Sequence, residues 1–306
     1  MNLRRILVAI DGSEYSGYAL NVAMKIAERY TSRIELLHVR SPRSGIPVVP
    51  APSIDPVMGA APSMILPATF PADRAKTETK EKSDDLLTDR LKIILGRGLE
   101  SSAQTSQAAD VGNEILKFAK SGDYDLMVVG SRGLGGLKNL LLGSVSSKVA
   151  KEAKRSVLVV KTRIENVVPK IMLGYDGSEE SKKALEFAED LGKKLYNNAR
   201  VDVVSVFNVP VSPEAYLGTE VDRWEKEMRQ QLESAVARLR SDGLTSDGKV
   251  LDHTNVSGAL AEAAEKGSYD LIVVGSRGLG RLKSLFLGSV ANGIANSAKT
   301  NILIVR

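Results

Sequence analysis

Short apolar runs alternate along the chain with longer segments in which apolar residues recur every three or four positions. The short runs are typical of strands and the longer segments of helices that pack on one side. Several short runs, such as Met127–Val129, are apolar throughout, which favours a parallel sheet covered on both faces. The predicted strands are residues 3–10, 33–39, 103–108, 125–130, 156–160, 171–175, 200–206, 249–253, 270–275 and 301–305. One helix is predicted after each Asp-Gly-Ser, with Ser13 or Ser178 as its N-cap, and the others cover residues 73–95, 112–120, 144–152, 222–240, 257–265 and 289–298.

The second half of the chain repeats the first. Residues 123–145 and 268–290 are identical at 18 of 23 positions, and ILVAIDGS at residues 6–13 matches IMLGYDGS at residues 171–178. A repeat of this length indicates tandem copies of one domain, which we place at residues 1–162 and 168–306. Each copy is predicted to be a doubly wound α/β domain with a five-stranded parallel sheet.

Composition narrows the possible functions. The 306 residues suit two ordinary domains. The absence of cysteine excludes disulfides, iron–sulfur clusters and a thiol nucleophile, and two histidines offer little to a histidine-rich metal site. Neither an 18-residue apolar run nor a signal sequence is present, so we expect a cytoplasmic protein without a membrane segment. The net charge of +5 is mild, and its clustering beside glycine-rich loops suits a small anion as well as a polyanion.

One segment departs from the repeat. Residues 42–71 hold eight of the eleven prolines and show neither a strand nor a helix period, whereas the matching residues 208–221 are far fewer. So long a loop is usually functional or disordered. A mobile insertion, a lid and a partner-binding arm all stay open.

A glycine-rich loop follows the fourth strand of each copy. It consists of Gly130, Gly133, Gly143 and Ser144 in the first copy, and of Gly275, Gly278, Gly288 and Ser289 in the second. Glycine lets backbone N–H groups approach a ligand closely. The helix that follows is predicted to begin with a glycine and a cap serine, Ser144 or Ser289, and its N-terminus favours phosphate. Arg132 and Arg277 add forked donors suited to phosphate oxygens. We predict an anion-binding loop in each copy, with ordinary turn and cap chemistry as the alternative.

An aspartate, Asp11 or Asp176, ends the first strand of each copy. The loops match neither the Walker motif nor the G-x-G-x-x-G fingerprint. We therefore expect the ligand between the first and fourth strands, where the strand order of a doubly wound sheet reverses. A carboxylate there can accept from ribose hydroxyls or hold Mg²⁺ beside phosphates, while an Asx-turn is the structural alternative.

At these residues the chain resembles the universal stress protein family in its tandem-domain form. The resemblance covers the whole chain except the proline-rich insertion, and its most specific element is the G-x2-G-x9-G-[S/T] loop of the ATP-binding branch. It implies an adenine nucleotide alpha hydrolase-like fold with strand order 3-2-1-4-5. It also implies an adenine nucleotide, ATP or else AMP or ADP, with Mg²⁺ as a possible companion.

The resemblance also assigns residues to the ligand. The adenine would contact the backbone of Val39 or Val206. The nucleoside would lie against Ala9, Ile10 and Asp11, or against Gly174, Tyr175 and Asp176, with Asp11 and Asp176 as the metal candidates. The phosphates would lie on Gly130, Arg132, Gly133, Gly143, Ser144 and Val145, or on Gly275, Arg277, Gly278, Gly288, Ser289 and Val290. Because Tyr175 replaces the aliphatic Ile10, its ring is expected to crowd or stack on the base, which leaves equal occupancy of the two sites open.

The resemblance further implies that the last strands pair. Residues 156–160 and 301–305 are apolar and would be unprotected sheet edges if left alone. Pairing them within one chain would imitate the dimer of one-domain relatives, and a homodimer of tandem chains stays open.

Three functions remain. The first is a nucleotide-binding regulator or sensor in the stress response with little or no turnover, because no catalytic base is evident: His38 lies inside a strand and its counterpart is Ser205. The second is a slow Mg²⁺-dependent ATPase or nucleotidyl transferase that uses Asp11 and Asp176. The third, nucleic-acid or partner binding through the basic residues 148–155, is the weakest because only 5% of residues are aromatic.

Overall fold

The computed structural model describes residues 2–42, 85–134, 141–164, 169–196, 199–208, 218–279 and 287–306. The proline-rich insertion beyond Pro42 and the first part of the helix predicted at residues 73–95 lie outside the described residues; residues 85–95 are helical as predicted. No helix within the described ranges is long and apolar enough to cross a bilayer.

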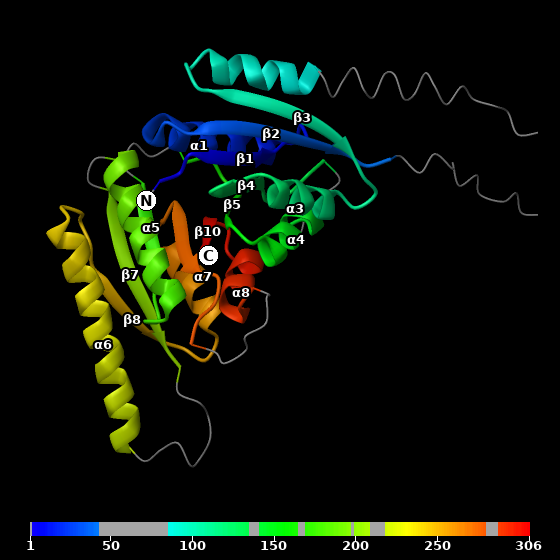
Figure 1. The fold of residues 1–306 in the computed structure, drawn as a ribbon. Helices are drawn as coiled ribbons and strands as arrows, with labels where there is room; N and C mark the ends of the chain where they lie inside the picture. Colours follow the sequence, from blue (N-terminus) through cyan, green and yellow to red (C-terminus); the bar gives the residue numbers. More distant parts are fainter. Residues whose placement is uncertain are drawn as a thin grey trace, which may run out of the picture.

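The described strands form one mixed sheet in the order β3-β2-β1-β4-β5-β10-β9-β6-β7-β8 (Figure 1). Each half has the predicted order 3-2-1-4-5, and all pairings within a half are parallel. The strands are β1 (Arg5–Ala9), β2 (Arg33–Arg40), β3 (Ser101–Gln107), β4 (Leu126–Gly130), β5 (Ser156–Val160), β6 (Lys170–Gly174), β7 (Arg200–Phe207), β8 (Gly248–Asp252), β9 (Leu271–Gly275) and β10 (Asn301–Val305).

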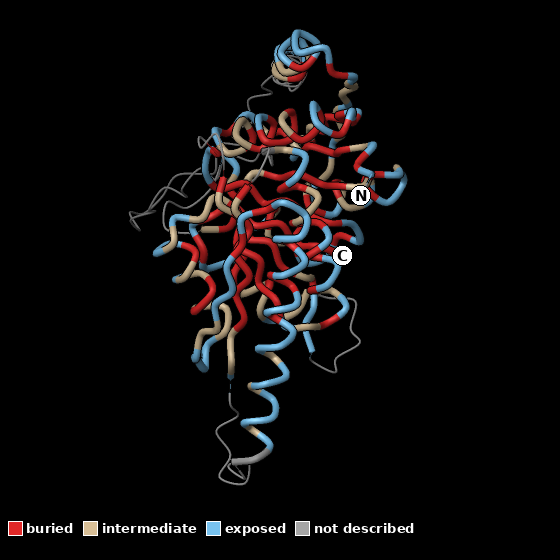
Figure 2. Tube along the Cα trace, turned by 90° about the vertical axis from the view of Figure 1, so that its left-hand side faces the viewer, coloured by how far each residue is buried: buried red, intermediate tan, exposed pale blue. Residues whose placement is uncertain are grey.

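Helices cover both faces of this sheet, as the apolar strands predict. The helices are α1 (Glu14–Tyr30), α3 (Val111–Ser121), α4 (Ser144–Glu152), α5 (Glu179–Tyr196), α6 (Gly218–Ser241), α7 (Val256–Lys266) and α8 (Ser289–Ser297). Side chains of α1, residues 85–95, α5 and α6 share one apolar core with the sheet, and those of α3, α4, α7 and α8 share the other. Figure 2 shows this buried interior, from which the exposed N-terminal part of α6 projects.

The start of α1 shows why the repeated Asp-Gly-Ser forms a strand-to-helix turn. Gly12 has φ +84°, a left-handed conformation that side chains other than glycine adopt at a cost. The Ser13 hydroxyl then accepts a hydrogen bond from the Ser16 N–H, which confirms Ser13 as the N-cap. The second copy repeats both features, with φ +77° at Gly177 and a 3.2 Å bond from the Ser181 N–H to the Ser178 hydroxyl.

The two halves meet at their last strands. β5 pairs with β10 in antiparallel register, with Leu158 opposite Leu303, so neither strand is left as an open edge. All strands of one half run parallel to its last strand, and the two last strands are antiparallel, so the strands of one half run opposite to those of the other. The carboxyl ends of the strands of one half therefore lie on the same side of the sheet as the amino ends of the strands of the other half.

A basic residue after each last strand reaches across this seam. The Lys161 ammonium donates to the carbonyls of Ala295 and Ala298 at the C-terminus of α8, at 2.7 and 2.6 Å. The Arg306 guanidinium donates to the carbonyl of Ala150, at 2.7 Å, near the C-terminus of α4. Cations favour helix C-termini, where carbonyls lack partners within the helix. Each half thus caps a helix of the other; we call these contacts the crossed caps.

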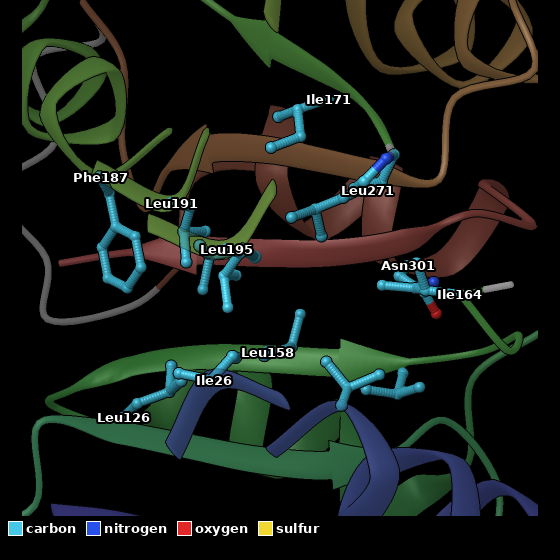
Figure 3. A pocket seen from close by; sticks show the side chains of 14 residues that line it. Ile26, Leu126, Leu158, Ile164, Ile171, Phe187, Leu191, Leu195, Leu271 and Asn301 are labelled. Atoms are coloured by element: carbon cyan, nitrogen blue, oxygen red, sulfur yellow. The ribbon is translucent and has the colours of Figure 1, made fainter. Parts of the chain in front are cut away.

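The halves also pack through an apolar layer between α1 and α5. It encloses a cavity of about 20 Å³, little more than the room for one water molecule. Figure 3 shows its lining from both halves, with Ile26 and Leu158 facing Phe187 and Leu191. The cavity lies at the seam, away from the glycine-rich loops, and its apolar walls indicate a packing defect rather than a nucleotide site.

Candidate functional site

The predicted loops lie at the carboxyl ends of β4 and β9. In the first half, the Ser131 N–H donates to the Val160 carbonyl at 2.7 Å and the Gly143 N–H donates to the Ser131 carbonyl at 2.7 Å. The second half repeats both bonds, from Ser276 to Val305 and from Gly288 to Ser276, at 2.8 Å each. The two ends of each loop are thus held together beside the last strand, although residues 135–140 and 280–286 lie outside the described residues.

The N-caps of the helices that follow the loops lie one residue earlier in the sequence than predicted. Ser144 and Ser289, expected as caps, are the first helical residues, and Gly143 and Gly288 occupy the N-cap positions. Glycine has no side chain with which to accept from the helix, and neither α4 nor α8 has a side-chain cap within the described part of the chain. Their first N–H groups are consequently left for water or an anion.

The aspartates at the ends of β1 and β6 tie the turns to the loops. Asp11 Oδ1 accepts from the Ser13 N–H at 3.0 Å and the Ser13 hydroxyl at 2.6 Å, while Oδ2 accepts from the Leu134 N–H at 3.2 Å. Asp176 makes the same three bonds with Ser178 and Leu279, at 3.1, 2.6 and 3.2 Å. The Asx-turn alternative is therefore present in both halves, and the second carboxylate oxygen holds the glycine-rich loop against the first strand.

This contact explains the second glycine of each loop. A Cβ added at Gly133 would lie 2.5 Å from Asp11 Oδ2, and one at Gly278 would lie 2.3 Å from Asp176 Oδ2. Contacts this short require either the carboxylate or the loop backbone to move. The loop after the fourth strand of each half thus approaches the aspartate at the end of the first strand most closely at these glycines.

The side chains assigned to the nucleoside divide between the two apolar cores of the sheet. Ala9 and Val206 are partly buried, and Val39 is buried, all against the core under α3 and α4 or its counterpart. The side chains of Ile10 and Tyr175 are buried in the other apolar core, and this burial raises the pKa of Tyr175. The expectation that the Tyr175 ring crowds or stacks on a base therefore finds no support in its position, which matches that of Ile10.

The carbonyls of these two residues are held from the neighbouring strand. His38 Nδ1 lies 2.6 Å from the Ile10 carbonyl, and the Ser205 hydroxyl donates to the Tyr175 carbonyl at 2.7 Å. Because a carbonyl only accepts, His38 Nδ1 carries a hydrogen in this contact. His38 is thus a satisfied sheet residue, as expected.

The two arginines have different neighbours. The Arg132 guanidinium lies 4.7 Å from the centroid of the Tyr15 ring, a cation–π distance. Arg277 instead has its Nε 3.9 Å from Glu180 Oε1. Tyr15 and Glu180 are each the second residue of the helix that follows the aspartate, so the two halves differ chemically at one equivalent position.

Other candidate chemistry is engaged in structural contacts. On the basic segment 148–155, Lys148 pairs with Asp110 at 2.7 Å and Arg155 with Asp123 at 3.1 Å. In the ranges that the structure describes, no three His, Cys, Asp or Glu side chains gather closely enough to hold a metal ion by themselves.

Sequence reasoning did not identify the roles of Tyr15, Glu180, Lys161 and Arg306. The first pair is visible as a mismatch when the repeats are aligned, since an aromatic residue stands where the other copy has an acid. The second pair is signalled by a basic residue directly after each last strand. Their partners belong to elements far away in the sequence, so only the structure shows what they contact.

Known proteins resemble this chain over its whole length or over one of its halves. The model of the universal stress protein family matches residues 2–161 and 168–306. A universal stress protein from Mycolicibacterium smegmatis is 29% identical over 98% of this chain and 96% of its own, and YxiE of Bacillus subtilis, also a universal stress protein, is 33% identical over 51% of this chain and 98% of its own.

Among solved structures, a universal stress protein from Archaeoglobus fulgidus has a TM-score of 0.67 at 20% identity, covering 100% of this chain and 97% of its own. This likeness shows the fold, a tandem Rossmann-type α/β architecture. Because the family model matches both halves and nearly every residue, the chain belongs to the universal stress protein family.

Proposed function

We propose that each half binds an adenine nucleotide in the crevice between its first and fourth strands, and that the chain acts as a nucleotide sensor or regulator in the stress response. We place the two binding domains at residues 1–162 and 168–306. The observation that carries the proposal is the duplicated arrangement of an anchored glycine loop with a helix N-terminus whose N-cap is glycine. Backbone donors fixed in this way suit the phosphates of ATP, ADP or AMP.

Within this proposal the phosphates lie on the loop ends and the helix starts, formed by Gly130, Arg132, Gly133, Gly143, Ser144 and Val145, or by Gly275, Arg277, Gly278, Gly288, Ser289 and Val290. The nucleoside lies against the backbone after the first two strands, at Ala9, Ile10 and Val39, or at Gly174, Tyr175 and Val206. The bonds from His38 and Ser205 support this assignment, because they fix the carbonyls of Ile10 and Tyr175.

The aspartates offer little to a metal ion. Both oxygens of Asp11 and of Asp176 already accept hydrogen bonds from the chain. A Mg²⁺ held by either carboxylate would take most of its ligands from phosphate oxygens and water. We therefore propose little or no turnover, and slow Mg²⁺-dependent ATP hydrolysis is the competing function.

Thermal unfolding of nucleotide-stripped protein tests the proposal. A ligand at about 100 times its Kd stabilises the domain that binds it by about 2.7 kcal/mol, so ATP should raise the melting temperature. An unchanged melting temperature with ATP, ADP and AMP would contradict nucleotide binding. Phosphate release over many turnovers that disappears in an Asp11→Ala/Asp176→Ala variant would instead favour the enzyme.

A further inference from the structure

We propose that Glu180 sets the ligand preference of the second crevice, which takes a less highly charged adenine nucleotide than the first crevice does. The inference rests on the proposed function and adds to it a difference between the two sites.

Residues 15 and 180 occupy the same place beside the two loops. A Cβ added at Gly130 would lie 2.7 Å from the backbone carbonyl carbon of Tyr15, and one at Gly275 would lie 2.7 Å from that of Glu180. The absence of a side chain at each glycine therefore lets the helix start approach the loop closely. A side chain at position 15 or 180 projects from this contact, next to the arginine of the loop.

The charge at this place differs between the halves. Glu180 brings a carboxylate within 3.9 Å of Arg277, and its side chain is only 24% exposed, so solvent screens the charge incompletely. A phosphate that binds Arg277 would share the guanidinium with Glu180 and would lie close to a negative charge. Tyr15 presents a neutral ring to Arg132 instead. Each further phosphate charge is thus less favourable in the second crevice than in the first.

The other acids that the structure describes at the strand ends and helix starts beside the loops do not explain such a difference. Asp11 and Asp176 make matching bonds and contribute alike to both crevices. Glu179, next to Glu180, pairs with Lys182 at 2.7 Å and is 78% exposed. Glu14, its counterpart in the first half, accepts a hydrogen bond from Tyr18.

The test isolates each crevice and varies the charge of the ligand. Gly278→Val should block the second crevice, so that only the first binds ligand, and Gly133→Val should block the first, so that only the second binds ligand. Alanine replaces valine if a variant does not fold. Calorimetric titration of nucleotide-stripped protein with AMP, ADP and ATP, without divalent ions, gives an affinity series for each crevice. We expect affinity in the second crevice to fall relative to the first by about threefold per added phosphate charge.

Substitutions in the isolated crevices assign this difference to one side chain. Glu180→Gln should remove it from the second crevice, and Tyr15→Glu should create it in the first. Glu179→Gln is the matched control, because it removes one negative charge from the same turn of α5 and should leave the series unchanged.

Three results would overturn the inference. Parallel affinity series in the two crevices, or a series that Glu180→Gln does not change, would refute it while nucleotide binding stands. Weaker ATP binding after Glu180→Gln would show that the carboxylate supports the ligand. If the wild-type chain and both isolated crevices bind no adenine nucleotide, the proposed function fails as well.

Discussion

The two halves keep the same backbone at the loops and differ in the side chains around them. Both have the left-handed glycine after the aspartate, the bonds from that aspartate to the loop and a glycine N-cap. Yet Tyr15 faces Glu180 in the alignment, Ile10 faces Tyr175 and His38 faces Ser205. The comparison teaches that the two halves share the backbone geometry of the candidate site, whereas the surrounding side chains make the two copies chemically distinct.

The largest expected effect is the loss of nucleotide binding from one half alone when the second glycine of its loop is replaced. Gly133→Val should remove binding from the first crevice alone and Gly278→Val from the second alone, because the added carbons would meet Asp11 or Asp176 at less than a normal contact distance. Calorimetry should show the stoichiometry fall by one nucleotide per chain in each variant and by two in the double variant. Undiminished stoichiometry in either single variant would contradict the assignment of that loop.

The next effect is a loss of stability when one of the crossed caps is removed. A lysine forms one of these caps and an arginine forms the other. Lys161→Met leaves the carbonyls of Ala295 and Ala298 without this donor in a buried place, since Lys161 is 6% exposed. We expect the free energy of unfolding to fall by about 1–3 kcal/mol. Urea denaturation measures it.

The Arg306→Met variant serves for comparison, and Lys266→Met, at an exposed position with an ion pair to Glu262, serves as the surface control. Equal stability of Lys161→Met and the wild type would show that water replaces the cap.

A further effect concerns how the contribution of Lys161 to stability depends on pH. Burial, with a contribution from nearby Arg132, lowers the pKa of Lys161 to about 8 from its ordinary value of 10.5. Between these values the unfolded chain binds more protons than the folded chain, so the contribution of Lys161 to stability should rise with pH across that interval. The slope should approach about 1.4 kcal/mol per pH unit.

The difference in unfolding free energy between the wild type and Lys161→Met, followed from pH 7 to pH 10.5, isolates this contribution. A difference that stays flat or falls with pH would mean that the folded chain does not lower this pKa.

The sequence predicts most of the fold, because apolar periodicity and the internal repeat are local signals. The strand order and the approach of the loops to Asp11 and Asp176 followed from these signals and the family resemblance. The prediction of Ser144 and Ser289 as cap residues was wrong, whereas Ser13 was confirmed, because an N-cap differs from the first helical residue by a single position and a glycine can fill either. The neighbours of Arg132 and Arg277 could not be predicted, since they depend on how two distant segments of the chain pack against each other.

The antiparallel seam between β5 and β10 has a consequence for anything that would recognise both crevices. Since the two candidate sites lie at opposite ends of the strands of one continuous sheet, a single flat partner surface can cover one of them at a time. α8 begins at the second crevice and ends under Lys161, on the edge where the first crevice opens, and α4 runs the opposite way to Arg306. Each of these helices therefore begins at one candidate site and ends beside the other. A partner protein could contact the two sites separately, at opposite ends of the molecule.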